Sequence, residues 1–430
     1  MNGFMVAAPH SGSGKTVVTL GLLRALKRRG MPLSPYKAGP DYIDPAFHRA
    51  ASGETCVNLD PWGMRPALIY RLTSAGRTDC LRITEAMMGL FDGAQDDTGS
   101  AADLAAMLGL PVVLVVDASR MGQSVAALVN GYRSHRRDVE IAGVILNRVG
   151  SARHRAMLER ALAPLGVRIL GVVMGDPALQ LPSRHLGLVQ AGEHEALEAF
   201  IEAAANAVEA GCDLEALIAL PLSSDPKKNV SANVLAPLGQ HIAVAQDQAF
   251  AFAYPHLLEG WRKQGAELSF FSPLADESPD VDADAVFLPG GYPELHAPAL
   301  AAAKHFRAGM SAAMQSGALI YGECGGYMVL GDALVDADGA SHAMLGLLPV
   351  TTSFAKRKRH LGYRLLEPVD IPMWRHGLRG HEFHYSTMQG AGNCDPLFRA
   401  SDALGNDLGA VGQRVGRVMG SYMHVIDQSA

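Results

Sequence analysis

Strand-length segments alternate with amphipathic helical stretches over the first 192 residues. The strand-length segments lie at 4–8, 32–37, 80–86, 111–117, 141–146 and 167–174. Helical periodicity appears between them, for example at 17–26, 124–132 and 153–162. Positions 111–116 are all apolar, which is typical of a strand covered on both faces. The alternation predicts an α/β fold with a doubly wound parallel sheet that binds ligands at the carboxyl ends of its strands.

A second alternating series begins near residue 240. We expect strands at 241–246, 267–271 and 283–289, a helix at 254–264, and a closing strand at 417–424. Residues 193–210 are rich in alanine and glutamate and favour a helix, whereas 221–235 are polar and predict a linker. The pattern predicts two α/β domains, at 1–192 and 240–430, separated by a helical segment and linker at 193–239.

A glycine-rich turn between the first strand and the first helix carries Gly14-Lys15-Thr16. In a phosphate-binding loop, backbone N–H groups hold the phosphates, the lysine reaches the terminal ones and the hydroxyl helps hold magnesium. The usual pattern has glycine five places before Gly14, where this chain has Pro9, so the loop is a variant. We predict a nucleotide site that includes Ser11, Gly12, Ser13, Gly14, Lys15 and Thr16.

Three polar residues follow predicted strands or lie in them. Asp41 stands in a Gly/Pro loop after the second strand, where it is either a turn former or a magnesium ligand. Glu85 lies in a mostly apolar segment, where an unpaired charge is costly; we favour a metal role over a structural one. Asn147 ends the strand at 141–146 and suits either adenine recognition or helix capping.

The stretch 318–328 reads as an apolar strand, a glycine-flanked cysteine and a helix. This is the layout of a nucleophile elbow with Cys324 at its apex. The helix N-terminus is expected to lower the thiol pKa. Backbone N–H groups of Gly325 and of Gly291, in an earlier glycine turn, would stabilise an oxyanion.

A histidine about a hundred residues downstream completes a candidate Cys–His pair for acyl transfer. The end of the closing strand selects His424, with His381 and His384 as rival bases. The Gly-Glu-Cys-Gly-Gly-Tyr stretch (322–327) with this histidine resembles class I glutamine amidotransferases, which usually have a glutamate two residues after the histidine. Here position 426 holds isoleucine, and Asp427 follows it. The third member is therefore missing, or Asp427 or another acid takes its place.

Composition excludes several classes. The 430 residues are 48% apolar and 19% charged, which argues against disorder, and the formal charge of −6 gives no support for nucleic acid binding. Five scattered cysteines fit a reducing compartment, and we expect a cytoplasmic protein without a signal peptide. No apolar run approaches the roughly 18 residues that span a bilayer. The basic run 356–359 is either a solvated loop or a contact for a polyanion.

The whole chain resembles the a,c-diamide synthases of corrinoid (vitamin B12) biosynthesis. The resemblance rests on the motifs at 10–16, 36–45 and 85–93 and on Pro-Gly-Gly-Tyr-Pro-Glu (289–294) and Gly-Glu-Cys-Gly-Gly-Tyr (322–327). Of these, Lys-Ala-Gly-Pro-Asp-Tyr-Ile-Asp-Pro (37–45) is the most specific. The N-terminal domain is similar to dethiobiotin synthetase, and the C-terminal domain looks like a class I glutamine amidotransferase.

The resemblance implies ATP- and magnesium-dependent amidation of the a and c acetates of hydrogenobyrinic or cobyrinic acid, through acyl phosphates. Glutamine is the implied nitrogen donor, and a homodimer would be common for such an enzyme. The resemblance also implies that Thr16, Asp41 and Glu85 are candidate magnesium ligands. It places Asp41, Tyr42 and Asp92 near the substrate carboxylate. Whether the corrinoid contains cobalt stays open, with the metal-free substrate favoured.

Two other functions stay open at this point. One is a P-loop ATPase that acts as a switch or in partitioning, with an amidotransferase-like domain used only for binding. The other is a ligase that acts on a different carboxylate. An intact Cys324 with a suitable His424 favours a working amidotransferase over a degenerate one.

Overall fold

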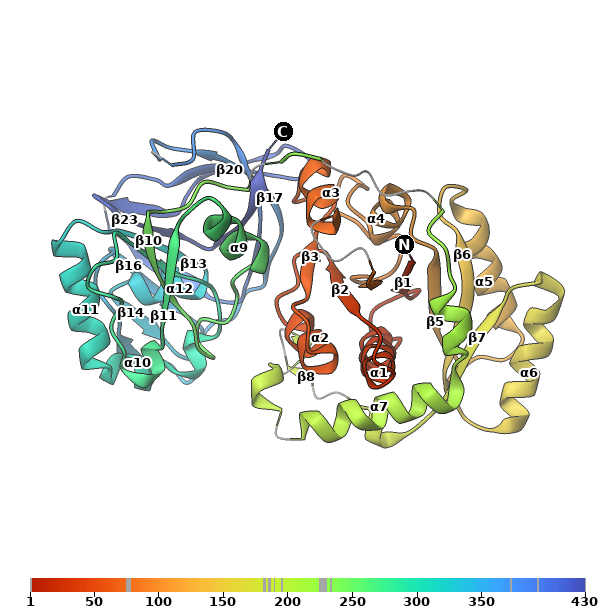
Figure 1. The fold of residues 1–430 in the computed structure, drawn as a ribbon. Coiled ribbons are helices and arrows are strands. Elements are labelled where there is room, and N and C mark those ends of the chain that lie inside the picture. Colours follow the sequence, from red (N-terminus) through yellow and green to blue (C-terminus); the bar gives the residue numbers. More distant parts are fainter. Residues whose placement is uncertain are drawn as a thin grey trace. The chain divides into compact units, whose positions relative to one another are not determined.

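The computed structural model describes residues 2–74, 79–180, 183–184, 187–188, 190–194, 196–223, 230–232, 234–371, 373–392 and 394–429 (Figure 1). It divides into two compact units. The first contains Met1–Trp62 and Pro66–Ala232, and the second contains Gly63–Arg65 and Asn233–Ala430. Residues 224–229 of the predicted linker lie outside the described residues.

The first unit is built on a sheet of seven parallel strands (Figure 1). In spatial order these are β3 (Val57–Leu59), β2 (Leu33–Ala38), β4 (Leu81–Glu85), β1 (Gly3–Ala7), β5 (Val112–Asp117), β6 (Ile141–Val149) and β7 (Ile169–Met174). The predicted doubly wound fold is confirmed. The chain order reverses around β1 and β4, so the loops after these strands meet at one edge of the sheet.

Eight helices of the described chain belong to this unit: α1 (Lys15–Arg28), α2 (Asp44–Ser52), α3 (Pro66–Ser74), α4 (Ala101–Leu108), α5 (Ser124–His135), α6 (Ala152–Leu162), α7 (Leu197–Gly211) and α8 (Leu214–Ile218). Helix α7 lies along α1, as Figure 1 shows, and their apolar faces share one core. Arg24 and Arg28 of α1 pair with Glu202 of α7. The helical segment after residue 193 is therefore part of the first unit. A two-stranded ribbon, β8 (Ser183–Arg184) and β9 (Gly187–Leu188), precedes it.

The second unit has a six-stranded sheet in the order β11 (Glu267–Phe271), β10 (His241–Ala245), β12 (Ala285–Leu288), β13 (Leu319–Glu323), β23 (Val418–Ser421) and β22 (Gln413–Val415). All neighbours are parallel except the edge strand β22. Its helices are α9 (Pro255–Lys263), α10 (Ala297–Ala302), α11 (Lys304–Gln315) and α12 (Gly325–Leu330). This confirms a second α/β domain.

Two further sheets complete this unit. One is antiparallel: β21 (Asp407–Val411), β20 (Phe398–Asp402), β17 (His360–Pro368), β18 (Leu378–His384) and β24 (Met423–Gln428). The other contains β15 (Ser341–Ala343), β14 (Ala333–Val335), β16 (Val350–Ser353) and β19 (Thr387–Ala391).

The predicted single closing strand at 417–424 is wrong. Tyr422 separates β23 from β24, and these strands belong to different sheets. His424 is thereby the second residue of β24 rather than the end of a strand. None of the helices in the described ranges combines the length and the apolar character needed to cross a membrane.

Candidate active sites

The loop between β1 and α1 has the backbone of a phosphate-binding turn. Gly12 and Gly14 have φ of +82° and +89°, a region that glycine enters without strain. A Cβ at Gly14 would lie 2.2 Å from Nδ2 of Asn147. The amide of Asn147 donates to the carbonyl of Ser13 at 2.9 Å, so Asn147 braces the loop. Its predicted contact with adenine stays a prediction.

Lys15 begins α1 and is buried, while Ser11 and Gly12 are exposed. Nζ of Lys15 donates a hydrogen bond to the carbonyl of Met88 at 2.6 Å. Burial lowers the pKa of Lys15 to about 8, against the opposing attraction of Glu85 and other carboxylates. The structure thus places the lysine of the loop beside the segment after β4.

The carboxylate of Glu85 is fully buried at the end of β4. Its Oε1 accepts from Oγ1 of Thr16 at 2.8 Å and from Nζ of Lys37 at 3.1 Å. Its Oε2 lies 2.6 Å from Nε2 of His48. Although burial raises the pKa of Glu85, these partners bring it well below its usual range. Thr16 and Glu85, two predicted metal ligands, are therefore in contact.

Lys37 lies among three acids. Its Nζ is 2.5 Å from Oδ2 of Asp44 and 3.8 Å from Oδ2 of Asp41, in addition to its contact with Glu85. Burial lowers the pKa of Lys37, but the three carboxylates outweigh burial and raise it. A fixed positive charge therefore holds Asp41 and Glu85 near each other.

The predicted substrate residues lie on two loops. Oδ1 of Asp41 accepts from the backbone N–H of Ile43 at 2.8 Å, which positions the start of α2. Tyr42, beside it, is partly buried. Asp92 accepts a hydrogen bond from the N–H of Gly89 at 2.8 Å. It is also one of the carboxylates whose attraction partly opposes the lowering of the Lys15 pKa by burial. Their contact with a substrate stays a prediction.

In the second unit, Cys324 stands between β13 and α12 with φ of +46° and ψ of −102°. This is the strained turn expected of a nucleophile elbow. A Cβ at Gly326 would lie 2.0 Å from the carbonyl oxygen of Leu288, so a side chain there is excluded. A Cβ at Gly325 would lie 2.9 Å from the backbone nitrogen of Gly291. The two glycines predicted to bind the oxyanion are neighbours.

The pKa shifts of the Cys–His pair differ from the sequence expectation. Burial raises the pKa of the Cys324 thiol above its usual range, where the helix N-terminus was expected to lower it. The helix is only six residues long, and desolvation dominates. Burial lowers the pKa of His424 well below its usual range, and the neighbouring His381 and His384 lower it further. Both shifts favour the uncharged form of the side chain concerned.

The acid nearest to His424 is Glu323. Its Oε2 lies 3.8 Å from Nδ1 of His424, and its Oε1 accepts from Tyr321 Oη at 3.0 Å and from the N–H of Val425 at 3.1 Å. Burial raises the pKa of Glu323 to about 8. Asp427 instead binds the guanidinium of Arg65 through both oxygens, at 2.8 and 2.9 Å.

The rival histidines contact His424 and Tyr422. The ring of His381 stacks on that of His424 at 4.8 Å, and His384 stacks on Tyr422 at 3.8 Å. The carbonyl of Phe383, between them in sequence, lies 3.9 Å from Sγ of Cys324. The basic run 356–359 is exposed.

Comparison with known proteins decides what these two sites belong to. Residues 4–189 match the family model of the CobQ/CobB/MinD/ParA nucleotide binding domain, and 241–430 match that of the CobB/CobQ-like glutamine amidotransferase domain. Over 434 residues the chain is 62% identical to hydrogenobyrinate a,c-diamide synthase of Brucella anthropi, covering 99% of both chains. It is 61% identical to that of Rhizobium meliloti over all of both chains, and 51% identical to that of Mesorhizobium japonicum.

The chain belongs to the hydrogenobyrinate a,c-diamide synthase family. It is a glutamine-dependent amidating ligase with an ATP-binding domain. This outcome confirms the resemblance and disfavours the switch protein.

Three residues of this synthase escaped the sequence analysis. Lys37 and Glu323 stand inside the quoted motifs, but no pattern assigns them a partner. His48, whose Nδ1 lies 3.3 Å from Sγ of Cys56, lies outside those motifs. Two features of the sequence could have pointed to them: Lys37 lies within an apolar strand, and Glu323 is an acid directly before the proposed nucleophile.

Proposed function

We propose that the chain amidates the a and c acetate carboxylates of hydrogenobyrinic acid, with ATP as activator and glutamine as nitrogen donor. Full-length identity to enzymes of that name, with a P-loop and a cysteine elbow both formed, supports the proposal. Amidation with glutamine needs both sites. The first activates the carboxylate, which does not react with ammonia until its oxygen becomes part of a better leaving group, and the second releases the ammonia.

In the first unit, a substrate carboxylate oxygen attacks the γ-phosphorus of ATP, and ADP leaves. The charge on the transferring phosphoryl group calls for fixed cations. Lys15 supplies one when its Nζ exchanges the carbonyl of Met88 for phosphate oxygens. Lys37 supplies another, and it forms ion pairs with both Asp41 and Glu85.

Magnesium fits the oxygen atoms at this site. Two ligands at right angles in an octahedral shell of about 2.1 Å lie roughly 3.0 Å apart. Thr16 Oγ1 and Glu85 Oε1 are 2.8 Å apart, which matches one edge of such a shell. Asp41 is the third candidate ligand. The ion, when bound, neutralises charge on the phosphates.

In the second unit, His424 takes the proton of Cys324, and the thiolate attacks the side-chain amide of glutamine. The N–H groups of Gly291 and Gly325 stabilise the oxyanion. Ammonia leaves with a proton from His424, and water then releases glutamate from the thioester. Ammonia attacks the acyl phosphate, and inorganic phosphate departs as the amide forms.

The test is incubation with ATP, magnesium, glutamine and either hydrogenobyrinic or cobyrinic acid, followed by mass spectrometry. We expect two carboxyl-to-amide conversions of hydrogenobyrinic acid in preference to the cobalt form. Any other mass change contradicts the diamide proposal, and preference for cobyrinic acid contradicts the metal-free substrate. Light scattering tests the expected homodimer separately.

Two variants separate the half-reactions. Cys324→Ala should lose glutamine-dependent synthesis but keep synthesis with added ammonium, because ammonium bypasses only the thioester. Lys15→Ala should abolish synthesis with either nitrogen source. Failure of ammonium to rescue the first variant, or a substantial rate in the second, would reject this division of roles.

A further inference from the structure

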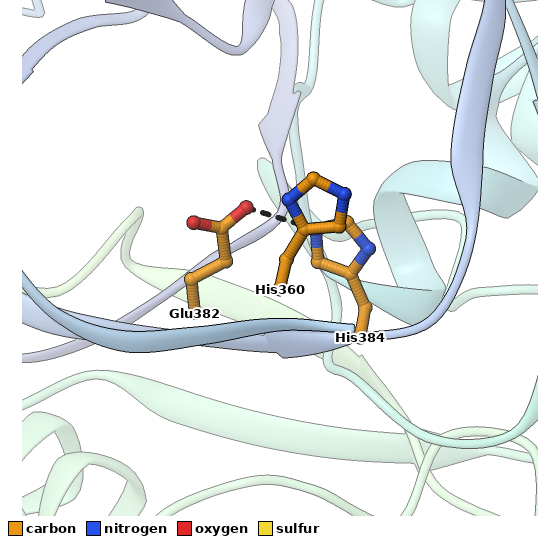
Figure 2. Close-up of side chains that lie close together, drawn as sticks. All are labelled: His360, Glu382 and His384. Carbon is orange, nitrogen blue, oxygen red and sulfur yellow. Dashed lines mark hydrogen bonds and ion pairs between the residues drawn. The ribbon is translucent and has the colours of Figure 1, made fainter. Parts of the chain in front are cut away.

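A cluster of two histidines and a glutamate occupies one face of the β17–β18 pair. His360 and His384 are directly opposite in the antiparallel register. Glu382 precedes His384 by two residues and therefore projects to the same face. One ligand atom from each of the three side chains lies within 4.8 Å of the others (Figure 2).

The hydrogen bonds of His384 call for a cation between it and Glu382. Its Nδ1 faces the carbonyl of Ser386 at 3.1 Å, and a carbonyl can only accept. Ser386 Oγ, 3.2 Å from the same nitrogen, gives its proton to Tyr422 Oη. With the ring proton on Nδ1, the lone pair on Nε2 points at Oε1 of Glu382, 2.9 Å away. Two acceptors this close need a second proton or a metal ion between them.

Arg364 binds one carboxylate oxygen of Glu382 and leaves the other oxygen free to bind the cation. Arg364 donates to Oε2 of Glu382 at 2.7 and 3.0 Å, which orients the carboxylate with Oε1 toward His384. The Ser386 carbonyl orients the imidazole in the same way. A partner behind each ligand is what metal sites in proteins use to fix tautomer and direction.

Of the three side chains in this cluster, that of His360 has the most room to reorient. Its ring stacks on His384 at 4.7 Å with 8° between the planes, and it is only partly buried. Ligand atoms around a tetrahedral zinc ion at about 2.0–2.1 Å are roughly 3.3 Å apart. Nε2 and Oε1 already approach that spacing, so the main adjustment is a turn of the less buried His360.

We propose that His360, Glu382 and His384 bind a divalent ion of the zinc class, with water as the fourth ligand. Two imidazoles and a carboxylate suit zinc, cobalt or nickel rather than magnesium, which prefers oxygen alone. The site is independent of the magnesium assigned to the first unit. Phe383, which stands between Glu382 and His384, has its carbonyl 3.9 Å from Sγ of Cys324.

The experiment is competition for zinc between the full-length chain, stripped of metal, and a chromophoric chelator. Excess magnesium is present to occupy oxygen sites. We expect one zinc per chain, with affinity lowered at least about tenfold in His360→Ala and more in His384→Ala. Cys324→Ser should bind as the parent does, as should His305→Ala, a control for the exposed His305–Asp276 pair.

Cobalt(II) gives a second readout that does not depend on stability. The visible spectrum of the bound cobalt ion reports four- or five-coordinate ligation by nitrogen and oxygen. We expect this spectrum to change in His360→Ala. The ring of His360 is not part of the core, so its removal should leave the fold intact. Absence of stoichiometric binding would overturn the proposal and leave a protonated Arg–Glu–His network. Binding that survives both histidine variants, or that is lost in Cys324→Ser, would overturn it as well.

Discussion

Oε2 of Glu323 lies 3.8 Å from Nδ1 of His424, although the two residues are about a hundred positions apart in the chain. The residue directly before the proposed nucleophile thus approaches the imidazole of the proposed base. Position 426, two residues after that histidine, is isoleucine. Glu323, the last residue of β13, is thus both the neighbour of the proposed nucleophile in the chain and a neighbour of the proposed base in space.

Glu323→Gln should lower the kcat of glutamine hydrolysis by about tenfold to a hundredfold. Burial raises the pKa of Glu323 to about 8, but an imidazolium formed when His424 accepts the thiol proton favours the carboxylate form of Glu323. An amide of the same size cannot ionise and so does not supply that charge. Synthesis from ammonium should be unchanged. The measurement is glutamate release alongside ammonium-dependent amidation.

Arg65→Ala is the control for that variant. It leaves the fully buried Asp427 without its guanidinium, which costs about 3–5 kcal/mol when one partner of a buried pair is removed. Urea unfolding should show the loss, while kcat of the folded protein stays near that of the parent. Full glutaminase activity in Glu323→Gln together with a large loss of kcat in Arg65→Ala would contradict the assignment of Glu323.

Local motifs predicted the parts of each site that depend on neighbouring residues. Lys15 and Cys324 are set by a strand, a glycine turn and a helix, so spacing was sufficient. Lys37 and His48 were missed because their partner Glu85 is distant in sequence and joins them only when β2, β4 and α2 pack. The break at Tyr422 was not predicted because β23 and β24 follow each other closely and are almost entirely buried, and only sheet membership separates them.

Lys37→Met should abolish amidation with either nitrogen source while glutamine hydrolysis continues. The change keeps the length of the side chain but removes the charge that lies among Asp41, Asp44 and Glu85. Three carboxylates then repel one another, and the magnesium concentration that gives half-maximal rate should change. Synthesis and glutamate release are measured across a magnesium series. A normal rate with normal magnesium dependence would remove Lys37 from the site.

Alkylation of Cys324 by iodoacetamide should become faster with pH, about tenfold per unit between roughly pH 6 and pH 9. Burial raises the pKa of this thiol, so the thiolate is scarce throughout that range and increases as protons are removed. His424 does not compensate, since burial keeps its imidazole neutral. Peptide mass spectrometry follows the single site. A plateau at acidic pH would instead indicate a thiolate–imidazolium pair before substrate binds.

Gly290→Ala should abolish most glutamine hydrolysis without unfolding the protein. A Cβ at this position would lie 2.3 Å from Cε1 of His424, closer than any real contact, and the ring has little room to retreat because His381 stacks on it. The imidazole must therefore leave the position that it has in the parent protein. Ammonium-dependent synthesis tests whether the first unit is intact.

Gly390→Ala is the matched control. Gly390 lies on β19 of the second unit, which also contains Gly290, and a Cβ there would meet nothing within 4 Å, so this variant should keep full hydrolysis. Equal activity in both variants would show that His424 is not the base.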